Sequence, residues 1–270
     1  MTTRIKLTAK DGHEFAVTHA HAPQGVGSVI ILHAVYGITD HISKLCSRFA
    51  AAGFSSFAPW LFDRVQADLV HPYNPDGTKS GSESYKSISE DKILMDIDAC
   101  REEANKYGNV AICGFCTGGT WAWVGASALD FDAAVVFYGS QVIEHIHRSP
   151  NCPTEMHYGD EDFVVPINIV EMIRTKHLDV PCHLYEGCNH AFFNPDQHAS
   201  FVEKKHKPNK KELTQEFGDK VEAGDRKDID RHNYYKAWSI APLDDVAEWK
   251  KSGFPFFRAS ITRIRKVTAD

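Results

Sequence analysis

The sequence predicts an α/β fold in which a doubly wound, mostly parallel sheet is flanked by helices. Three observations support this prediction. Residues 27–34 form a continuous apolar run, which is typical of a central parallel strand. Strand-like and helix-like segments alternate from residue 27 to residue 186, which implies right-handed crossovers between parallel strands. Residues 114–118 form a glycine-flanked turn between a predicted strand and a predicted helix.

The elements are expected in the following order. Residues 3–19 alternate as an opening hairpin with its turn at Asp11-Gly12. The later strands are predicted at 27–34, 54–59, 109–113, 131–138, 154–158 and 182–185. Apolar residues at helical spacing predict helices at 41–52, 90–107, 119–126 and 167–177. Residues 63–88 are polar and rich in Gly, Pro and Ser, so we expect a long surface excursion there.

The chain shows no internal repeat or linker, so residues 1–270 are predicted to form a single domain. Residues 203–232 are dense in Lys, Glu and Asp, which indicates a solvated loop or short helix. Residues 233–265 return to aromatic and aliphatic spacing, and we expect one or two closing helices packed on the sheet.

Composition excludes several classes of function. The net charge of -6 and the absence of a long basic run argue against nucleic-acid binding. No apolar stretch approaches the ~20 residues of a membrane span, and no secretion signal is visible at the N-terminus. The seven cysteines are scattered and odd in number, which favours reduced thiols in a cytoplasmic protein.

The turn at residues 114–118, Gly-Phe-Cys-Thr-Gly, carries the clearest indication of chemistry. It has the pattern of a nucleophile elbow, with cysteine in the position usually held by serine. Such a turn holds the Cys116 sulfur at a helix N-terminus, where the helix dipole and the free N–H groups favour a thiolate. The N–H of Thr117 is then placed to donate to an oxyanion.

Two other interpretations of this turn stay open on the sequence alone. Cys113 and Cys116 form a Cys-x-x-Cys pair, which is also found in redox dithiols and in halves of zinc sites. Against this, Cys113 falls within the predicted strand and the chain has no second Cys-x-x-Cys. The remaining interpretation is a glycine-rich turn with a purely structural role. We expect no metal and no cofactor.

A thiol nucleophile needs a base, and the base needs an acid that orients it. In this architecture the acid and then the histidine follow the nucleophile along the chain. Residues 158–166 offer three acids, of which we favour Asp162 over Asp160; helix capping is the alternative role for Asp162. Residues 185–192 carry His190 after small residues. Histidines at the ends of or within predicted strands are interpreted as core residues: His33, His157 and His183.

These motifs resemble those of the dienelactone hydrolase family, which implies an α/β-hydrolase fold. The resemblance runs from about residue 27 to about residue 193. Its motifs are Gly114-Phe115-Cys116-Thr117-Gly118-Gly119, Gly159-Asp160-Glu161-Asp162 with Val165-Pro166, and Tyr185-Glu186-Gly187 with His190-Ala191-Phe192. The resemblance implies a triad of Cys116, His190 and Asp162, since the family's aspartate, counted back from the proline, falls at Asp162. It also implies that the second oxyanion-hole N–H belongs to Val35.

The sequence departs from the family pattern at three positions around the expected site. Ala34 stands where founding members have a glutamate thought to pair with the resting thiol. Asn194 replaces an arginine that grips a substrate carboxylate, and Trp60 replaces an aspartate. These differences argue against the small anionic dienelactone as substrate. The aromatic residues expected to bind a more apolar acyl or aromatic group are Tyr36, Trp60, Phe192 and Phe193.

The sequence therefore predicts a cofactor-independent hydrolase of a small-molecule ester, lactone or thioester. Cys116 would attack the carbonyl, His190 would transfer the proton, and Asp162 would orient His190. Two other functions stay open. One is acyl transfer on the same fold to an alcohol or amine, and the other is a non-catalytic binding or regulatory role with an inert thiol.

Overall fold

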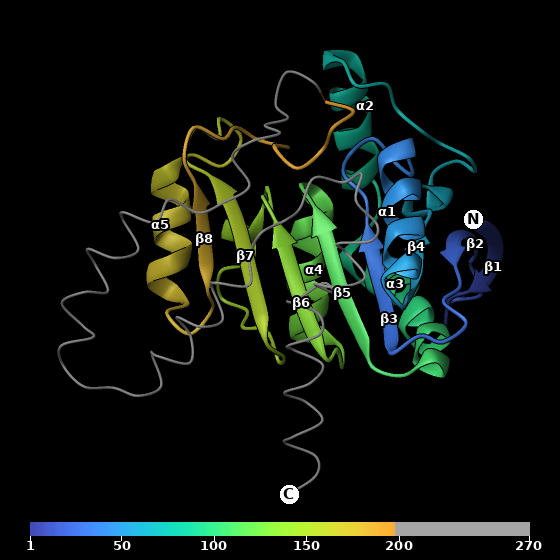
Figure 1. Ribbon diagram of the computed structural model, residues 1–270. Coiled ribbons are helices and arrows are strands. Elements are labelled where there is room, and N and C mark those ends of the chain that lie inside the picture. Colours follow the sequence, from blue (N-terminus) through green and yellow to red (C-terminus); the bar gives the residue numbers. More distant parts are fainter. Residues whose placement is uncertain (198–270) are drawn as a thin grey trace, which may run out of the picture.

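An eight-stranded sheet forms the centre of the molecule, as Figure 1 shows. The computed structural model describes residues 1–197. The strands are β1 (Thr3–Thr8), β2 (Glu14–Ala20), β3 (Gly27–Leu32), β4 (Phe54–Pro59), β5 (Val110–Phe115), β6 (Ala133–Phe137), β7 (Thr154–Gly159) and β8 (Cys182–Tyr185). Their order in the sheet is β1-β2-β4-β3-β5-β6-β7-β8. The pairings from β4 through β8 are parallel, whereas β1 with β2 and β2 with β4 pair antiparallel.

Helices cover the two faces of this sheet. They are α1 (Asp40–Ala51), α2 (Pro75–Lys86), α3 (Glu90–Ala104), α4 (Thr117–Ala128) and α5 (Ile167–Lys176), with short 3₁₀ helices at Leu61–Arg64, Asn105–Tyr107 and Val142–His145. Figure 1 shows α1 in front of the sheet and α3 and α4 behind it. This arrangement confirms the predicted doubly wound, mostly parallel α/β fold. The predicted hairpin, strands and four helices lie within a few residues of the observed ones.

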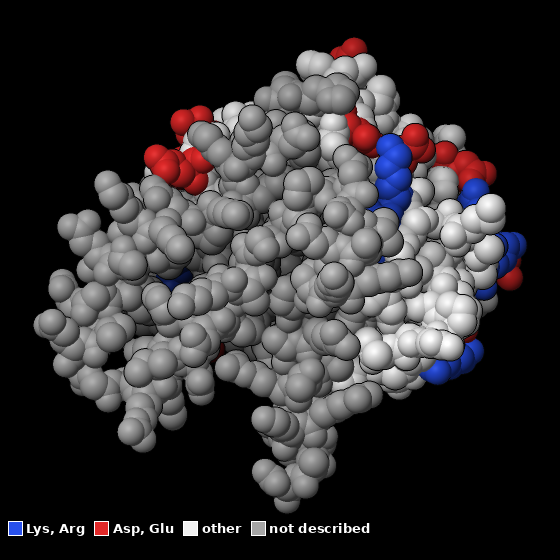
Figure 2. All heavy atoms as spheres, in the orientation of Figure 1, with Lys and Arg blue, Asp and Glu red and all other residues white. Residues whose placement is uncertain are grey.

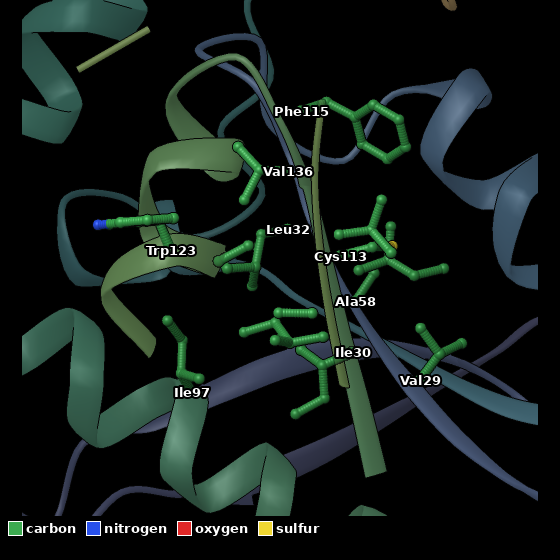
Figure 3. Close-up of a cluster of buried hydrophobic side chains, with 14 of the residues drawn as sticks. Val29, Ile30, Leu32, Ala58, Ile97, Cys113, Phe115, Trp123 and Val136 are labelled. Atoms are coloured by element: carbon green, nitrogen blue, oxygen red, sulfur yellow. The ribbon is translucent and has the colours of Figure 1, made fainter. Parts of the chain in front are cut away.

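The core lies on both faces of the central strands. β3, β4 and β5 are buried along their whole length, as expected for parallel strands covered on two sides. Successive side chains of a strand point to opposite faces. Figure 3 accordingly shows Leu32 on the side of Trp123 and Ile97, and Cys113 and Phe115 on the other side.

The prediction that residues 63–88 form a surface excursion is wrong for its second half, which contains α2. The Asn74 side chain accepts a hydrogen bond from the N–H of Gly77 (2.8 Å), and Pro75 occupies the first helical position. A Cβ at Gly81 would lie 1.8 Å from the carbonyl oxygen of Val35, so glycine lets α2 pack against the backbone that follows β3. The polar, Gly- and Ser-rich composition hid this helix because its apolar stripe is short.

The strand order places the ends of β3 and β5 side by side at a reversal point of the sheet. The chain passes from β3 outward to β4 and then returns across β3 to β5. In open α/β sheets ligands bind in the crevice beyond the carboxyl ends of strands at such a point. The turn that follows β3 and the turn at Cys116 both lie there.

Charged side chains are mixed on the surface. Figure 2 shows Lys and Arg interspersed with Asp and Glu on the described part of the face in view. Among residues 1–197, no helix has the combined length and apolarity that crossing a membrane requires. The predicted charged segment at 203–232 and the predicted closing helices at 233–265 lie outside the described residues.

Candidate active site

Cys116 occupies a strained backbone turn between β5 and α4. Its φ of 56° and ψ of -120° are unusual for a residue with a side chain. The N–H of Cys116 donates to the carbonyl of Phe137 (3.0 Å), and its own carbonyl accepts from the N–H of Ser140 (3.3 Å). These bonds, to the last residue of β6 and to the turn that follows it, hold the strained conformation in place.

Glycines around Cys116 allow the turn to close. A Cβ at Gly114 would lie 1.9 Å from the carbonyl oxygen of Gly118, which is far inside van der Waals contact. A Cβ at Gly118 would lie 2.4 Å from the carbonyl oxygen of Leu32. The second contact also sets how closely α4 approaches the end of β3. The glycine spacing in the sequence is therefore a packing requirement of this elbow.

The Cys113–Cys116 pair forms no disulfide. All seven cysteines of the chain lie within residues 1–197, and all are free thiols. Cys113 is buried inside β5, and burial raises the pKa of its thiol. A buried, unionised thiol is a poor partner for redox exchange, so the structure gives no support to a dithiol at this turn.

Asp162 and His190 are joined by a buried hydrogen bond. Nδ1 of His190 donates to Oδ2 of Asp162 at 2.8 Å, and the Asp162 side chain is fully buried. The other carboxylate oxygen, Oδ1, accepts the N–H groups of Val164 (2.8 Å) and Val165 (2.9 Å). These three bonds fix the carboxylate and the imidazole ring. The Asp162 carboxylate therefore accepts hydrogen bonds from the backbone through one oxygen and from His190 through the other.

Asp160 has a different partner. Its Oδ1 accepts the N–H of Gly187 (2.6 Å), in the turn after β8. Asp160 thereby ties the loop after β7 to the loop that carries His190, without bonding to the imidazole. Of the two acids that the sequence offered, Asp162 is the one that contacts the histidine.

The Cys116 thiol and the His190 imidazole shift the pKa of one another. Burial opposes a charge on His190, but the Cys116 thiolate and the Asp162 carboxylate outweigh it and raise the pKa of His190 to about 10. Burial also opposes a charge on Cys116. His190, the N–H of Thr117 and the hydroxyl of Ser140 outweigh it and lower the pKa of the thiol. Both shifts favour a thiolate–imidazolium pair.

Two backbone N–H groups belong to residues that line the same cavity as Cys116. Thr117 is the first residue of α4, where the N–H has no partner within the helix. Val35 lies in the turn after β3, and its N–H donates to no residue of the described chain. The Tyr85 hydroxyl on α2 donates to the carbonyl of His33 (2.7 Å) and so holds this turn from the opposite side.

A cavity of about 1280 Å³ opens over Cys116. Its walls come from the turn after β3, from α2, from the start of α4 and from the loop that carries His190. Phe115, Trp121 and Tyr138 line it near the thiol, and no arginine lines it within the described part of the chain. Charged side chains line it as well, namely Lys79, Lys86, Glu90, Glu144 and Asp196, so a ligand in this cavity meets both apolar and charged surface.

Of the four predicted substrate-binding aromatics, Tyr36 lines this cavity, and the other three lie outside its described walls. The Trp60 indole donates to the Thr18 hydroxyl (3.0 Å), and the Arg4 guanidinium lies 4.4 Å from the centre of its ring. Phe192 is buried against Tyr138 and Tyr185, and Phe193 stacks on Phe115 and Phe137. Phe192 is buried in the core, and Trp60 and Phe193 pack against it as partly buried side chains.

Tyr73, Thr39 and Thr78 also line the cavity and were absent from the sequence prediction. The Tyr36 hydroxyl bonds to Thr78 on α2 (2.8 Å), and the Tyr73 hydroxyl donates to Thr39 (2.9 Å). Asn194 donates to the Tyr73 hydroxyl at 3.1 Å. Asn194 and Tyr73 thus join this wall through neutral hydrogen bonds, whereas Asp196, which also lines the cavity, pairs with Lys44. The Asn74-Pro75 helix start was the sequence signal that could have located α2.

Comparison with known proteins identifies the family. The family model for the dienelactone hydrolase family matches residues 15–220. The chain belongs to the dienelactone hydrolase family. It is accordingly a hydrolase that acts on ester bonds, and the fold is that of the α/β-hydrolases.

Similar proteins carry related names. The carboxymethylenebutenolidase of Pseudomonas putida is 24% identical over 207 residues, which cover 71% of this chain and 86% of that protein. A Synechocystis protein assigned as a carboxymethylenebutenolidase is 28% identical over 201 residues, covering 66% of this chain and 81% of its own. A solved structure of a Klebsiella pneumoniae protein assigned as a dienelactone hydrolase has a TM-score of 0.61 at 25% identity, covering 75% of this chain and 93% of its own.

Proposed function

We propose that this hydrolase cleaves an ester, lactone or thioester with Cys116 as nucleophile, His190 as acid and base, and Asp162 as the residue that orients His190. The observation that carries the proposal is the set of interactions that leads from the buried Asp162 carboxylate through His190 to the Cys116 thiol. The Asp162 carboxylate holds Nδ1 of His190 at 2.8 Å, and His190 and Cys116 favour one another's charged forms at the elbow.

The reaction follows from this arrangement. The Cys116 thiolate attacks the substrate carbonyl carbon, and the carbonyl oxygen becomes an oxyanion. The N–H groups of Val35 and Thr117 donate to that oxyanion, an effect worth about 3–4 kcal/mol per donor in enzymes where one was removed. As the tetrahedral intermediate collapses, the bond to the leaving group breaks, and His190 protonates the departing oxygen or sulfur.

The resulting acyl-enzyme is a thioester on Cys116. His190, now neutral, accepts a proton from a water molecule that attacks the thioester carbonyl. A second tetrahedral intermediate forms in the same oxyanion hole. Its collapse releases the carboxylic acid and regenerates the thiolate and the imidazolium. Asp162 keeps the proton on Nδ1 throughout, so that Nε2 is the nitrogen that exchanges protons.

The cavity favours an acyl group that is neutral and at least partly apolar. Ala34 contributes no charge to the wall, and Asn194 lies in a neutral network with Tyr73. Trp121 and Tyr138 offer aromatic surface near the thiol. The described wall contains no arginine, and its two lysines, Lys79 and Lys86, are outnumbered by three acids, Glu90, Glu144 and Asp196. We therefore propose an uncharged acyl or aromatic ester or lactone. The free cysteines are consistent with action in the cytoplasm.

A substrate screen tests this function. Wild-type protein and the Cys116→Ala variant are compared on p-nitrophenyl esters of increasing acyl length and on small lactones, neutral and anionic. We expect hydrolysis by the wild type alone and a preference for neutral substrates. Equal turnover by the alanine variant would remove Cys116 from the mechanism. Product analysis with an added alcohol separates hydrolysis from acyl transfer, because transfer yields a new ester.

A further inference from the structure

A second group of chemically active side chains lies on the sheet away from the cavity. Glu155 and His157 are two residues apart in β7 and therefore point to the same face. His183 in β8 pairs directly with His157 in the strand ladder. The potential ligand atoms of the three side chains all lie within 4.8 Å of one another. None of the three lines the cavity over Cys116.

Their contacts resemble those around a metal ion. Nε2 of His183 lies 3.2 Å from Oε2 of Glu155, and the rings of His157 and His183 stack with centres 4.9 Å apart. Ligand bonds of about 2.0–2.2 Å to one ion would place the donor atoms roughly 3–4 Å apart. The 3.2 Å between Nε2 of His183 and Oε2 of Glu155, which is a hydrogen bond in this structure, falls in that range, so an ion bound there would replace the shared proton.

All three side chains are buried. Their exposed fractions are 4% for Glu155, 0% for His157 and 8% for His183. A carboxylate is costly to bury unless hydrogen-bond donors or a cation compensate its charge.

An outer hydrogen bond completes the arrangement. Nδ1 of His157 lies 2.9 Å from the hydroxyl of Tyr185. Histidines that bind metals almost always use their other ring nitrogen in such a bond, which fixes the ring and its tautomer. Two histidines and one carboxylate on a rigid strand pair form a donor set that suits Zn²⁺ and similar divalent ions.

We propose that Glu155, His157 and His183 bind a divalent transition-metal ion, with Zn²⁺ as the best match to the donors. The site would join β7 to β8. These are the strands that lead into Asp162 and His190, so the ion would brace the two loops on which the acid and the base are carried. The metal would act on the stability of this edge of the sheet and would take no part in the chemistry at Cys116.

The test uses the full chain with Cys116→Ala as background, which removes the active-site thiol as a competing ligand. Zinc affinity is measured by competition with a chromogenic chelator after treatment with EDTA. We expect one ion per chain, and a rise in the melting temperature on adding Zn²⁺. Glu155→Gln and His183→Gln should each abolish both effects. Tyr185→Phe should weaken binding by about 10- to 100-fold. His21→Gln, at an exposed histidine, is the matched control.

A second measurement needs no further variant. In the Co²⁺-loaded Cys116→Ala protein, two bound histidines should give two exchangeable imidazole N–H signals with large paramagnetic shifts. Their absence would overturn the proposal, as would full zinc affinity in both Glu155→Gln and His183→Gln. Neither outcome bears on hydrolysis by the wild-type protein, so this proposal and the triad fail separately.

Discussion

Replacing Asp162 by asparagine tests the triad sharply, because the backbone dictates which way the new amide points. Oδ1 of Asp162 accepts the N–H groups of Val164 and Val165, and Oδ2 accepts from Nδ1 of His190. An asparagine keeps both backbone bonds only with its oxygen in the Oδ1 position. Its NH₂ group then faces Nδ1 of His190 and selects the tautomer protonated on Nε2. That tautomer cannot accept a proton from the thiol or from water.

The size of the loss follows from the opposite orientation. Turning the amide over restores the productive tautomer but leaves the buried N–H of Val165 and the partly buried N–H of Val164 without acceptors, at about 1–3 kcal/mol each. The productive state is therefore disfavoured by roughly 2–6 kcal/mol, which corresponds to a fall in kcat of about 30- to 10⁴-fold. KM should change little, since Asp162 does not line the described cavity.

Steady-state hydrolysis of a p-nitrophenyl ester measures this loss, with circular dichroism as a check on folding. Asp160→Asn is the matched control, because Asp160 bonds to the N–H of Gly187 and not to the imidazole. Its effect on kcat should be mild. A reversed order of the two effects would refute the assignment and make Asp160 the acid. Unchanged kcat in Asp162→Asn would refute the triad itself.

Three further predictions concern the Cys116 thiol, the elbow and the turn after β3. Iodoacetamide should label Cys116 at neutral pH far faster than the other six cysteines. His190→Ala should shift the inflection of the labelling rate against pH upward. An inflection that does not move would mean that His190 does not activate the thiol. Gly118→Ala should lower the free energy of unfolding by about 1–3 kcal/mol or more, measured in urea, because its Cβ would meet backbone at 2.4 Å. Gly12→Ala, in open space at positive φ, should cost about 1–2 kcal/mol, and a greater loss there would contradict the packing argument. Tyr85→Phe should lower kcat more than it alters KM, and a change confined to KM would assign Tyr85 to ground-state binding.

The elbow could be predicted from the sequence because its constraints are local. Glycines at 114 and 118 are required by contacts within a few residues of Cys116 or with the neighbouring strand end. The positions of Asp162 and His190 follow from strand ends, which apolar runs mark clearly. Parallel strands place such ends at one edge of the sheet, so their residues converge without further information.

The cavity wall could not be predicted in the same way, because it depends on packing between distant segments. Phe192 and Phe193 follow His190 after one intervening residue, yet Phe192 is buried in the core and Phe193 is partly buried against it. Trp60 follows a strand end but lies against Arg4 at the antiparallel side of the sheet. Proximity in sequence to a catalytic residue says little about which face a side chain joins. The α2 wall depends instead on how closely Gly81 approaches Val35.

Alanine instead of a carboxylate at position 34 leaves one negative charge fewer near the Cys116 thiol. The hydroxyl of Tyr85 lies in the same wall, and burial together with the charge of Cys116 keeps its pKa well above the usual value. It therefore stays protonated and adds no negative charge that would oppose a thiolate. With no anion at position 34 and with His190 lowering the pKa of the thiol, we expect the resting sulfur to be stabilised as a thiolate. Such a thiolate is open to oxidation and alkylation until substrate covers it. A neutral substrate or competitive inhibitor in the cavity should thus protect Cys116 from hydrogen peroxide, and inactivation at the same rate with and without it would contradict a thiolate exposed to the cavity.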